Sequence, residues 1–94
     1  MTVDATETGA LIEVRGDLDL GTSEALASAI SGAVNGGVTT LDLSGLRFID
    51  STGLRLLLVT ARTLGDALSI IPSPAVRRTM DIAGIADRLP LEQA

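Results

Sequence analysis

The apolar and polar residues of this chain follow two periods in turn. Strand-like alternation of apolar and polar residues occurs over residues 10–16, 38–43 and 67–71. Apolar residues recur every three or four positions, as on one face of a helix, over residues 22–37, 52–66 and 74–84. Strands that alternate with helices predict an α/β sheet with parallel neighbours, joined by right-handed crossovers.

The first predicted helix has a hydroxyl residue at its start and glycines at its end. Thr22 is the expected N-cap, and Gly36 and Gly37 are expected to close the helix. The face expected to be buried consists of Leu26, Ile30, Ala33 and Val34.

The second and third predicted helices carry clearer signals. The second has an apolar stripe made of Leu54, Leu57, Leu58, Ala61 and Leu64. Gly65 is expected to end this helix. In the third, Ser73 is the expected N-cap, Pro74 suits the first helical position, and Gly84 is the expected end.

Two further segments are predicted as edge strands. Residues 3–6 are expected to pair with the strand over 10–16 through a turn at Thr8-Gly9, and residues 87–93 are expected at an edge where Pro90 is tolerated. A chain of 94 residues builds one core. The sequence therefore predicts a single α/β domain over residues 1–94, with a mixed sheet, mainly parallel core strands and about three to four helices.

Composition restricts the function. The formal net charge is −5 on a chain that is 46% hydrophobic, which excludes a disordered acidic tail and gives no electrostatic footprint for nucleic acid or an anionic membrane. Cysteine and histidine are both absent, so there is no thiolate site and the commonest metal ligand and general base is missing. The N-terminus does not resemble a signal peptide and no apolar run approaches the roughly 20 residues of a membrane span. These features predict a cytoplasmic protein that binds a protein or a small ligand.

Parallel strands place the loops that follow them along one edge of the sheet, where ligands and partners dock. Three segments are expected there, over residues 17–21, 44–50 and 72–73. Ser51, which follows the second of these loops, is therefore expected to lie near Asp17 and Asp19 and near the cap of the third helix.

The stretch FIDSTGL, residues 48–54, contains two hydroxyls at the start of the second predicted helix. Ordinary N-capping is the simplest role for such a hydroxyl. If Asp50 is the N-cap, however, Ile49 and Leu54 fall on the two positions of a hydrophobic staple, which favours this register over one capped by Ser51. The Ser51 hydroxyl is then not needed as the N-cap acceptor, and it lies beside free N–H groups at the positive end of the helix. This position suits a phosphate.

Catalytic and metal-binding alternatives have less support. A nucleophile elbow needs a glycine two residues before the serine, where this chain has Ile49, and neither a histidine nor a lysine can serve as base. A hard cation could be held by Asp17, Asp19 and Asp50, although acidic residues at strand ends are more often caps or solvated. No catalytic residue, cofactor or metal is therefore predicted.

Three collinear segments resemble those of STAS domains, in particular the bacterial anti-sigma factor antagonists. They are RGDLDLGTSEAL, LDLSGLRFIDSTGLRLLL and IPSPAVRRTMDIAGI, which together extend over most of the chain. One departure is the C-terminus, because the family often has a longer final helix whereas this sequence stops at Ala94. The resemblance implies a STAS-like fold and a regulatory protein that is not an enzyme.

The resemblance also implies a partner switch. The first serine of the family's Asp-Ser-Ser/Thr-Gly motif is the phosphoacceptor, and it corresponds to Ser51 here. The unphosphorylated protein binds an anti-sigma factor with serine kinase activity and so releases a sigma factor; a serine phosphatase resets the switch. The residues that this implies for partner binding are Asp19, Asp50, Ser51, Thr52 and Gly53.

Two alternatives stay open at this point. One is a scaffold without phosphorylation, such as the small STAS subunit of phospholipid-trafficking ABC transporters, which carries nearly the same Asp-Ser core. The other is a sensor that binds a nucleotide.

Overall fold

The computed structural model describes residues 1–6 and 9–92. Its main elements follow one another along the chain as β1 (Thr2–Thr6), β2 (Gly9–Leu18), α1 (Leu20–Ala33), β3 (Val38–Ile49), α2 (Ser51–Leu64), β4 (Leu68–Pro72) and α3 (Pro74–Ala83). Short 3₁₀ turns, η1 (Gly65–Ala67) and η2 (Ala86–Arg88), follow α2 and α3. The predicted alternation of strands and helices is confirmed.

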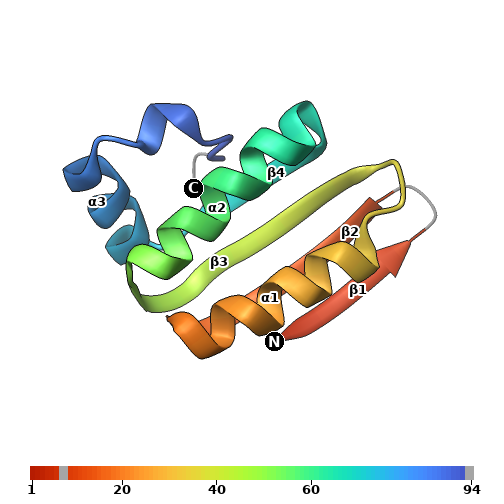
Figure 1. Cartoon of the computed structure of the whole chain (residues 1–94), viewed down its shortest axis with the longest axis horizontal. Helices are drawn as coiled ribbons and strands as arrows, with labels where there is room; N and C mark the ends of the chain where they lie inside the picture. Colours follow the sequence, from red (N-terminus) through yellow and green to blue (C-terminus); the bar gives the residue numbers. More distant parts are fainter. Residues whose placement is uncertain (7–8, 93–94) are drawn as a thin grey trace.

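The four strands form one sheet in the order β1-β2-β3-β4 (Figure 1). β1 pairs with β2 antiparallel, whereas β2 with β3 and β3 with β4 pair parallel. The predicted mixed sheet with mainly parallel core strands is therefore confirmed, including the edge strand at the N-terminus. Thr8 of the predicted turn lies outside the described residues.

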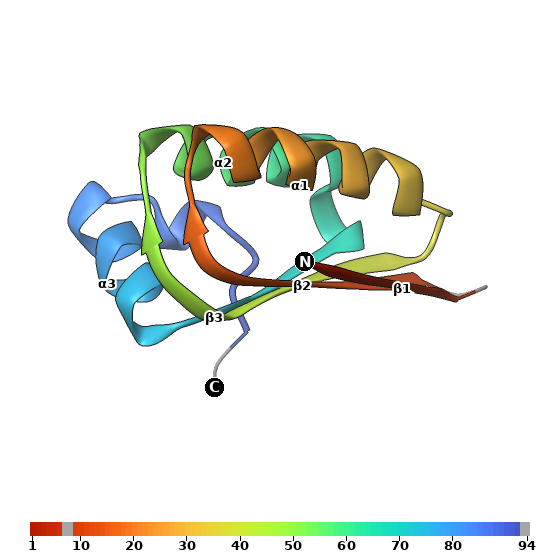
Figure 2. The same ribbon diagram turned by 90° about the horizontal axis from the view of Figure 1, so that it is seen from below.

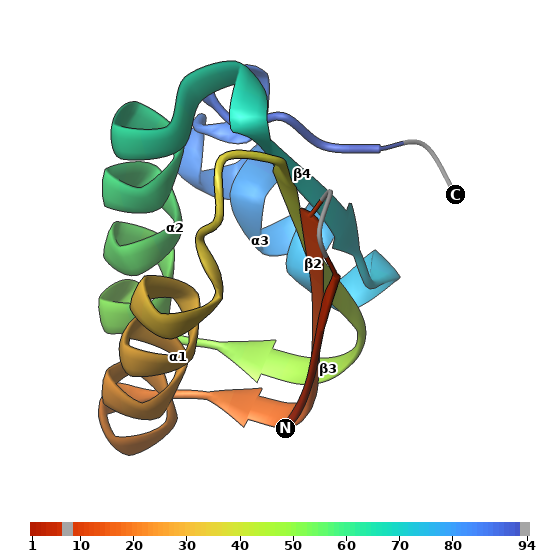
Figure 3. The ribbon, with the colours of Figure 1, turned by 90° about the vertical axis from the view of Figure 1, so that its right-hand side faces the viewer.

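Helices α1 and α2 lie side by side on one face of the sheet, and α3 lies beyond the end of β4, beside the second half of β3 (Figures 2 and 3). The core between these layers is built from aliphatic side chains and Met80, with Ile12, Leu41 and Leu57 fully buried. No helix within the described ranges is long and apolar enough to cross a membrane.

The two central strands are longer than the sequence predicts. β2 continues to Leu18 and β3 to Ile49, so the predicted loops over 17–21 and 44–50 are wrong for most of their length. From Glu13 to Leu18 on β2, the paired positions on β3 run from Asp42 to Ile49, and register shifts mark the two places where β3 has an extra residue. Such bulges bend a strand and increase its twist. The ends of both strands curve towards the helix layer (Figure 2).

The predicted start of the first helix is also wrong. α1 begins at Leu20 with Asp19 as its N-cap, and Thr22 is the third residue of the helix. The helix ends at Ala33 rather than at the glycine pair, so that Val34 is exposed instead of sharing the buried face of Leu26 and Ile30. Asp19 replaces Thr22 as the cap because β2 and α1 are separated by this one residue.

The ends of the other two helices agree with the predictions. Gly65 caps α2 with a φ of 53°, and Gly84 caps α3 with a φ of 74° in the left-handed region that favours glycine. The Ser73 hydroxyl accepts a hydrogen bond from the N–H of Val76 at 3.1 Å, with Pro74 at the first helical position.

The predicted C-terminal edge strand over residues 87–93 is too long. Residues 86–88 form η2, and only a single parallel bridge joins Leu91 to Ile70 of β4. The N–H of Ile70 donates to the carbonyl of Pro90 at 2.9 Å, and the N–H of Glu92 donates to the carbonyl of Ile70 at 2.7 Å. Proline restricts the pairing because it lacks an N–H donor.

Candidate functional site

Two strand-to-helix junctions lie side by side and define the candidate site. Leu18, the last residue of β2, pairs with Ile49, the last residue of β3. The N–H of Asp50 donates to the carbonyl of Leu18 at 3.1 Å, which ties the second junction to the first. Asp19 and Asp50, each the single residue between a strand and a helix, therefore stand on neighbouring turns, as the sequence predicts.

Asp50 is the N-cap of α2. Its carboxylate accepts a hydrogen bond from the N–H of Gly53 at 2.9 Å, and its carbonyl accepts from the N–H of Leu54 at 3.0 Å. The predicted register is confirmed, with Ile49 buried and Leu54 half-buried at the positions of a staple. These two bonds leave the N–H groups of Ser51 and Thr52 at the positive end of the helix.

Ser51 is the first residue of α2 and is exposed. Its hydroxyl makes no hydrogen bond to any part of the chain over 1–6 and 9–92. A phosphate on this oxygen would lie in solvent next to two free backbone donors. The geometry can therefore accept the modification without repacking the core.

Asp19 is held by a reciprocal capping box. Its carboxylate accepts from the N–H of Thr22 at 3.1 Å, and its own N–H donates to the Thr22 hydroxyl at 2.8 Å. The hydroxyl oxygen lies 3.0 Å from the Asp19 carboxylate and 2.9 Å from the Asp17 carbonyl, so its single hydrogen has these two alternative acceptors. Hydrogen bonds from the N–H and hydroxyl of Thr22 lower the pKa of Asp19 below its ordinary value. Asp19 thus presents a fixed negative charge beside Ser51.

Gly53 serves packing at this site. A Cβ at this position would lie 2.8 Å from Cγ1 of Ile49, 2.9 Å from Cγ of Leu18 and 2.9 Å from the carbonyl oxygen of Leu18. Only glycine lets the first turn of α2 approach the end of β2 this closely. Gly53 is buried and Thr52 is half-buried, so Ser51 is the most accessible of these three residues.

The cap of the third helix does not join the site. Pairing of β4 with β3 stops at Leu43, well before β3 ends at Ile49, so Ser73 lies near the middle of β3 rather than beside Ser51. This expectation is wrong because β2 and the bulged strand β3 continue beyond the last pair of β3 with β4. A shared edge is therefore formed by the first two junctions.

The possible cation site of Asp17, Asp19 and Asp50 does not assemble. The Asp17 carboxylate lies 3.6 Å from the guanidinium of Arg47, while Asp19 and Asp50 cap their helices. In the described part of the chain, no three acidic side chains form a group that could hold a metal ion.

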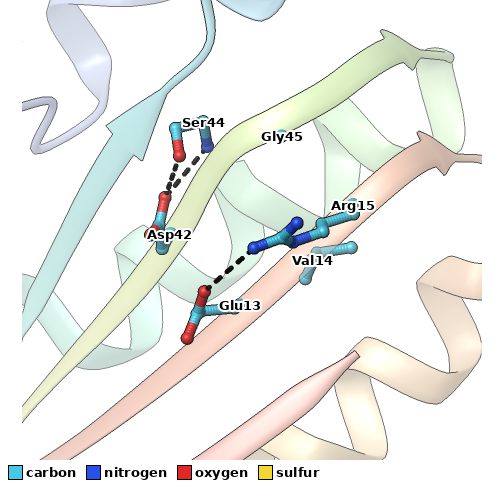
Figure 4. Close-up of a pocket in the computed structure, with 6 residues that line it drawn as sticks. All are labelled: Glu13, Val14, Arg15, Asp42, Ser44 and Gly45. Atoms are coloured by element: carbon cyan, nitrogen blue, oxygen red, sulfur yellow. Dashed lines mark hydrogen bonds and ion pairs between the residues drawn. The ribbon is translucent and has the colours of Figure 1, made fainter.

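A separate polar depression of about 270 Å³ lies along β2 and β3 (Figure 4). Glu13 and Asp42 are directly opposite in the sheet register, and Arg15 lies 4.0 Å from Glu13. The Ser44 hydroxyl donates to the Asp42 carboxylate at 2.6 Å, and this bond is the main reason that the pKa of Asp42 is lowered. None of the predicted site residues lines this depression.

Sequence reasoning missed two residues near these junctions, and it gave Thr22 the role of N-cap. Thr22 completes the capping box, and the spacing Asp-x-x-Thr was the available signal. Leu20 and Phe48 are large apolar side chains that remain exposed next to the two junctions. Periodicity carries no signal for them, because they fall in segments that the sequence predicts as loops.

Comparison with known proteins supports the family resemblance. A family profile described as "Mlab, STAS domain" matches residues 1–92. The chain is 35% identical over 82 residues to an anti-sigma F factor antagonist of Lysinibacillus sphaericus, covering 80% of this chain and 70% of the relative. It is 31% identical over 81 residues to the anti-sigma-F factor antagonist RsfB of Mycobacterium tuberculosis, covering 81% of this chain and 66% of the relative.

Solved structures agree. The unphosphorylated form of the anti-sigma factor antagonist SpoIIAA superposes with a TM-score of 0.77 at 26% identity, covering 99% of this chain and 86% of that one. An anti-sigma factor antagonist from Mycobacterium paratuberculosis gives a TM-score of 0.83 at 28% identity, covering 99% of this chain and 84% of that one. With a family profile over residues 1–92, relatives that share about a third of its sequence and solved structures of the same fold, the chain belongs to the STAS domain family.

Proposed function

We propose that this chain is an anti-sigma factor antagonist whose binding is switched by phosphorylation of Ser51. The unphosphorylated form binds an anti-sigma factor that has serine kinase activity and thereby frees a sigma factor. Phosphorylation of Ser51 by that partner ends the interaction, and a serine phosphatase restores it. The chain itself acts by binding and catalyses no reaction.

The exposed Ser51 hydroxyl at the start of α2 is the observation that carries this proposal. It has no hydrogen-bond partner among the described residues, and the N-cap role belongs to Asp50. Relatives that share about a third of its sequence are named as anti-sigma factor antagonists. The proposed partner surface contains the predicted residues Asp19, Asp50, Ser51 and Thr52. The buried Gly53 lets the first turn of α2 pack closely against the end of β2 under this surface.

Charge explains how the modification would act. A phosphoserine adds a charge of about −1.5 to −2 at pH 7. On this chain it would stand beside the fixed charges of Asp19 and Asp50, on a surface that must lose water when a partner docks. Repulsion and uncompensated desolvation together cost about 3 kcal/mol or more, which corresponds to a loss of affinity of roughly a hundredfold.

The folded state should tolerate the phosphate. At the first position of α2 it meets the helix dipole and the free N–H groups, which stabilise an anion by a few tenths of a kcal/mol. The switch would therefore operate by changing the binding surface while the fold stays the same. Circular dichroism spectra of the two forms should coincide.

The test uses the anti-sigma factors encoded in the same genome, purified and loaded with nucleotide. Each is incubated with ATP and wild-type chain, and with the matched variants Ser51→Ala and Thr52→Ala. We expect phosphate on the wild type and on Thr52→Ala but none on Ser51→Ala. Calorimetric titration should then show the unmodified chain and Ser51→Ala binding alike, with the phosphorylated chain weaker by roughly a hundredfold.

Equal affinities of the two forms would refute the switch. If no anti-sigma factor binds the chain or phosphorylates Ser51, the scaffold alternative gains support. Copurification of a transporter ATPase, instead of an ATP-binding anti-sigma factor, would identify that alternative directly.

A further inference from the structure

Two large apolar side chains are exposed near the two strand-to-helix junctions, the second of which leads into Ser51. Leu20 is 63% exposed and Phe48 is 54% exposed. Other exposed apolar residues lie elsewhere on the described chain, for example Val34 after α1 and Ile82 on α3. A single exposed apolar residue needs no explanation, but two close to the paired ends of β2 and β3 form a candidate contact surface.

The backbone brings these two side chains to the same part of the molecule. Leu20 is the first residue of α1 and directly follows Asp19, just as Ser51 is the first residue of α2 and follows Asp50. Phe48 pairs with Asp17 in the sheet, one step before the pair of Leu18 with Ile49. The hydrogen bond from Asp50 to Leu18 holds the two junctions together.

Phe48 is the only aromatic residue of the chain, yet the fold leaves more than half of its surface in water. Its neighbours along β3, Leu46 and Ile49, are buried. Full burial of a phenylalanine side chain is worth about 1.5–3 kcal/mol, so this fold forgoes about half of that stabilisation. Buried aromatic anchors dominate the binding energy of protein interfaces, which is where Phe48 would recover it.

We propose that Leu20 and Phe48 are the two apolar anchors with which this chain binds its anti-sigma factor, at the edge of the sheet where Ser51 lies. The inference rests on the function proposed above and names the contacts that supply its affinity. Asp19 and Asp50 form an acidic border to these anchors. The surface therefore fits an apolar depression on the partner that is edged by cationic side chains.

This arrangement also explains how a phosphate on Ser51 would weaken binding. The anchors can enter the partner only if the surface around the two junctions loses its water, and Ser51 belongs to that surface. A phosphate there would keep its hydration and hold both anchors away from the partner. Truncation of either anchor should therefore weaken the same contact with the anti-sigma factor that phosphorylation of Ser51 weakens.

The test compares Leu20→Ala and Phe48→Ala with Ile82→Ala, an apolar truncation on α3 where the side chain is 82% exposed. Affinity for the purified, ADP-loaded anti-sigma factor is measured by calorimetry. We expect each anchor variant to bind at least about tenfold more weakly and Ile82→Ala to bind like the wild type. The melting temperatures should remain close to that of the wild type, because all three side chains are largely exposed.

The same titrations include Ser51→Glu, so that the two proposals can fail separately. If Ser51→Glu weakens binding while both anchor variants bind normally, the anchors are refuted and the switch stands. If Ile82→Ala weakens binding as much as the anchor variants do, the proposed location is refuted. If the wild type binds none of the anti-sigma factors, the proposed function is refuted together with the anchors.

Discussion

Replacement of Gly53 by alanine should destabilise the protein, although alanine is the better helix former. The new Cβ would lie within 2.9 Å of two core side chains and of the carbonyl oxygen of Leu18. That oxygen cannot retreat freely, because it accepts the hydrogen bond from the N–H of Asp50 at 3.1 Å. The first turn of α2 must therefore move away from β2.

The expected size follows from two opposing effects. Replacing glycine by alanine within a helix is worth up to about 1 kcal/mol in favour of folding. An extra carbon forced into a packed region costs about 1–3 kcal/mol, and the upper part of that range applies here because one of the three close atoms is backbone. We expect a net loss of about 1–2 kcal/mol, or roughly 5–15 °C in melting temperature for a domain of this size.

A matched control is available in α1. A Cβ at Gly32 would meet no atom of a neighbouring element within 4 Å, so Gly32→Ala should stabilise the protein by up to about 1 kcal/mol. Urea unfolding followed by circular dichroism measures both variants. If Gly53→Ala is as stabilising as Gly32→Ala, the close approach of α2 to β2 is wrong.

Three further expectations concern the two helix caps and the chemistry of Ser51. Asp50→Ala should lower the free energy of unfolding by about 1 kcal/mol, and Ser51→Ala should leave it nearly unchanged; similar large losses in urea unfolding would contradict the capping register. The pKa of Asp19, followed by NMR titration, should lie below its ordinary value and rise in Thr22→Val, whereas identical titrations would show that Thr22 does not hold it. Folding lowers the pKa of Asp19. The stabilisation that Asp19 gives is therefore fully present at pH values above its unfolded-state pKa, and it is lost as the pH falls through its folded-state pKa. The purified chain should hydrolyse neither esters nor nucleotides, and turnover abolished by Ser51→Ala would contradict the binding-only function.

The parts of the fold that could be predicted were those where one periodicity holds for a whole element. α2 has a regular apolar stripe and an acidic cap, and its start at Ser51 follows from the staple formed by Ile49 and Leu54. The site could be placed at the sheet edge because Asp19 and Asp50 directly follow parallel strands.

The second half of β3 could not be predicted, because the bulges disturb its alternation. Its buried residues Leu43, Leu46 and Ile49 are three positions apart, which matches neither a regular strand nor a complete helical stripe. An extra residue in each of two places restores the inward direction of the side chains, but only the partner strand reveals where they occur. The start of α1 was missed for a related reason, since strand and helix leave a single residue between them.

The sheet order has a consequence for anyone seeking to block this interaction. In open α/β sheets, small molecules bind in the crevice where the order of strands reverses. Here the four described strands follow the sheet in their order along the chain, and α1 and α2 cover the same face (Figure 1). Because the order does not reverse among the described strands, the sheet forms no such crevice beside Ser51. An inhibitor of the proposed complex is therefore better sought as a ligand for the apolar depression proposed on the partner, for example a constrained peptide that reproduces the junction with Leu20 and Phe48.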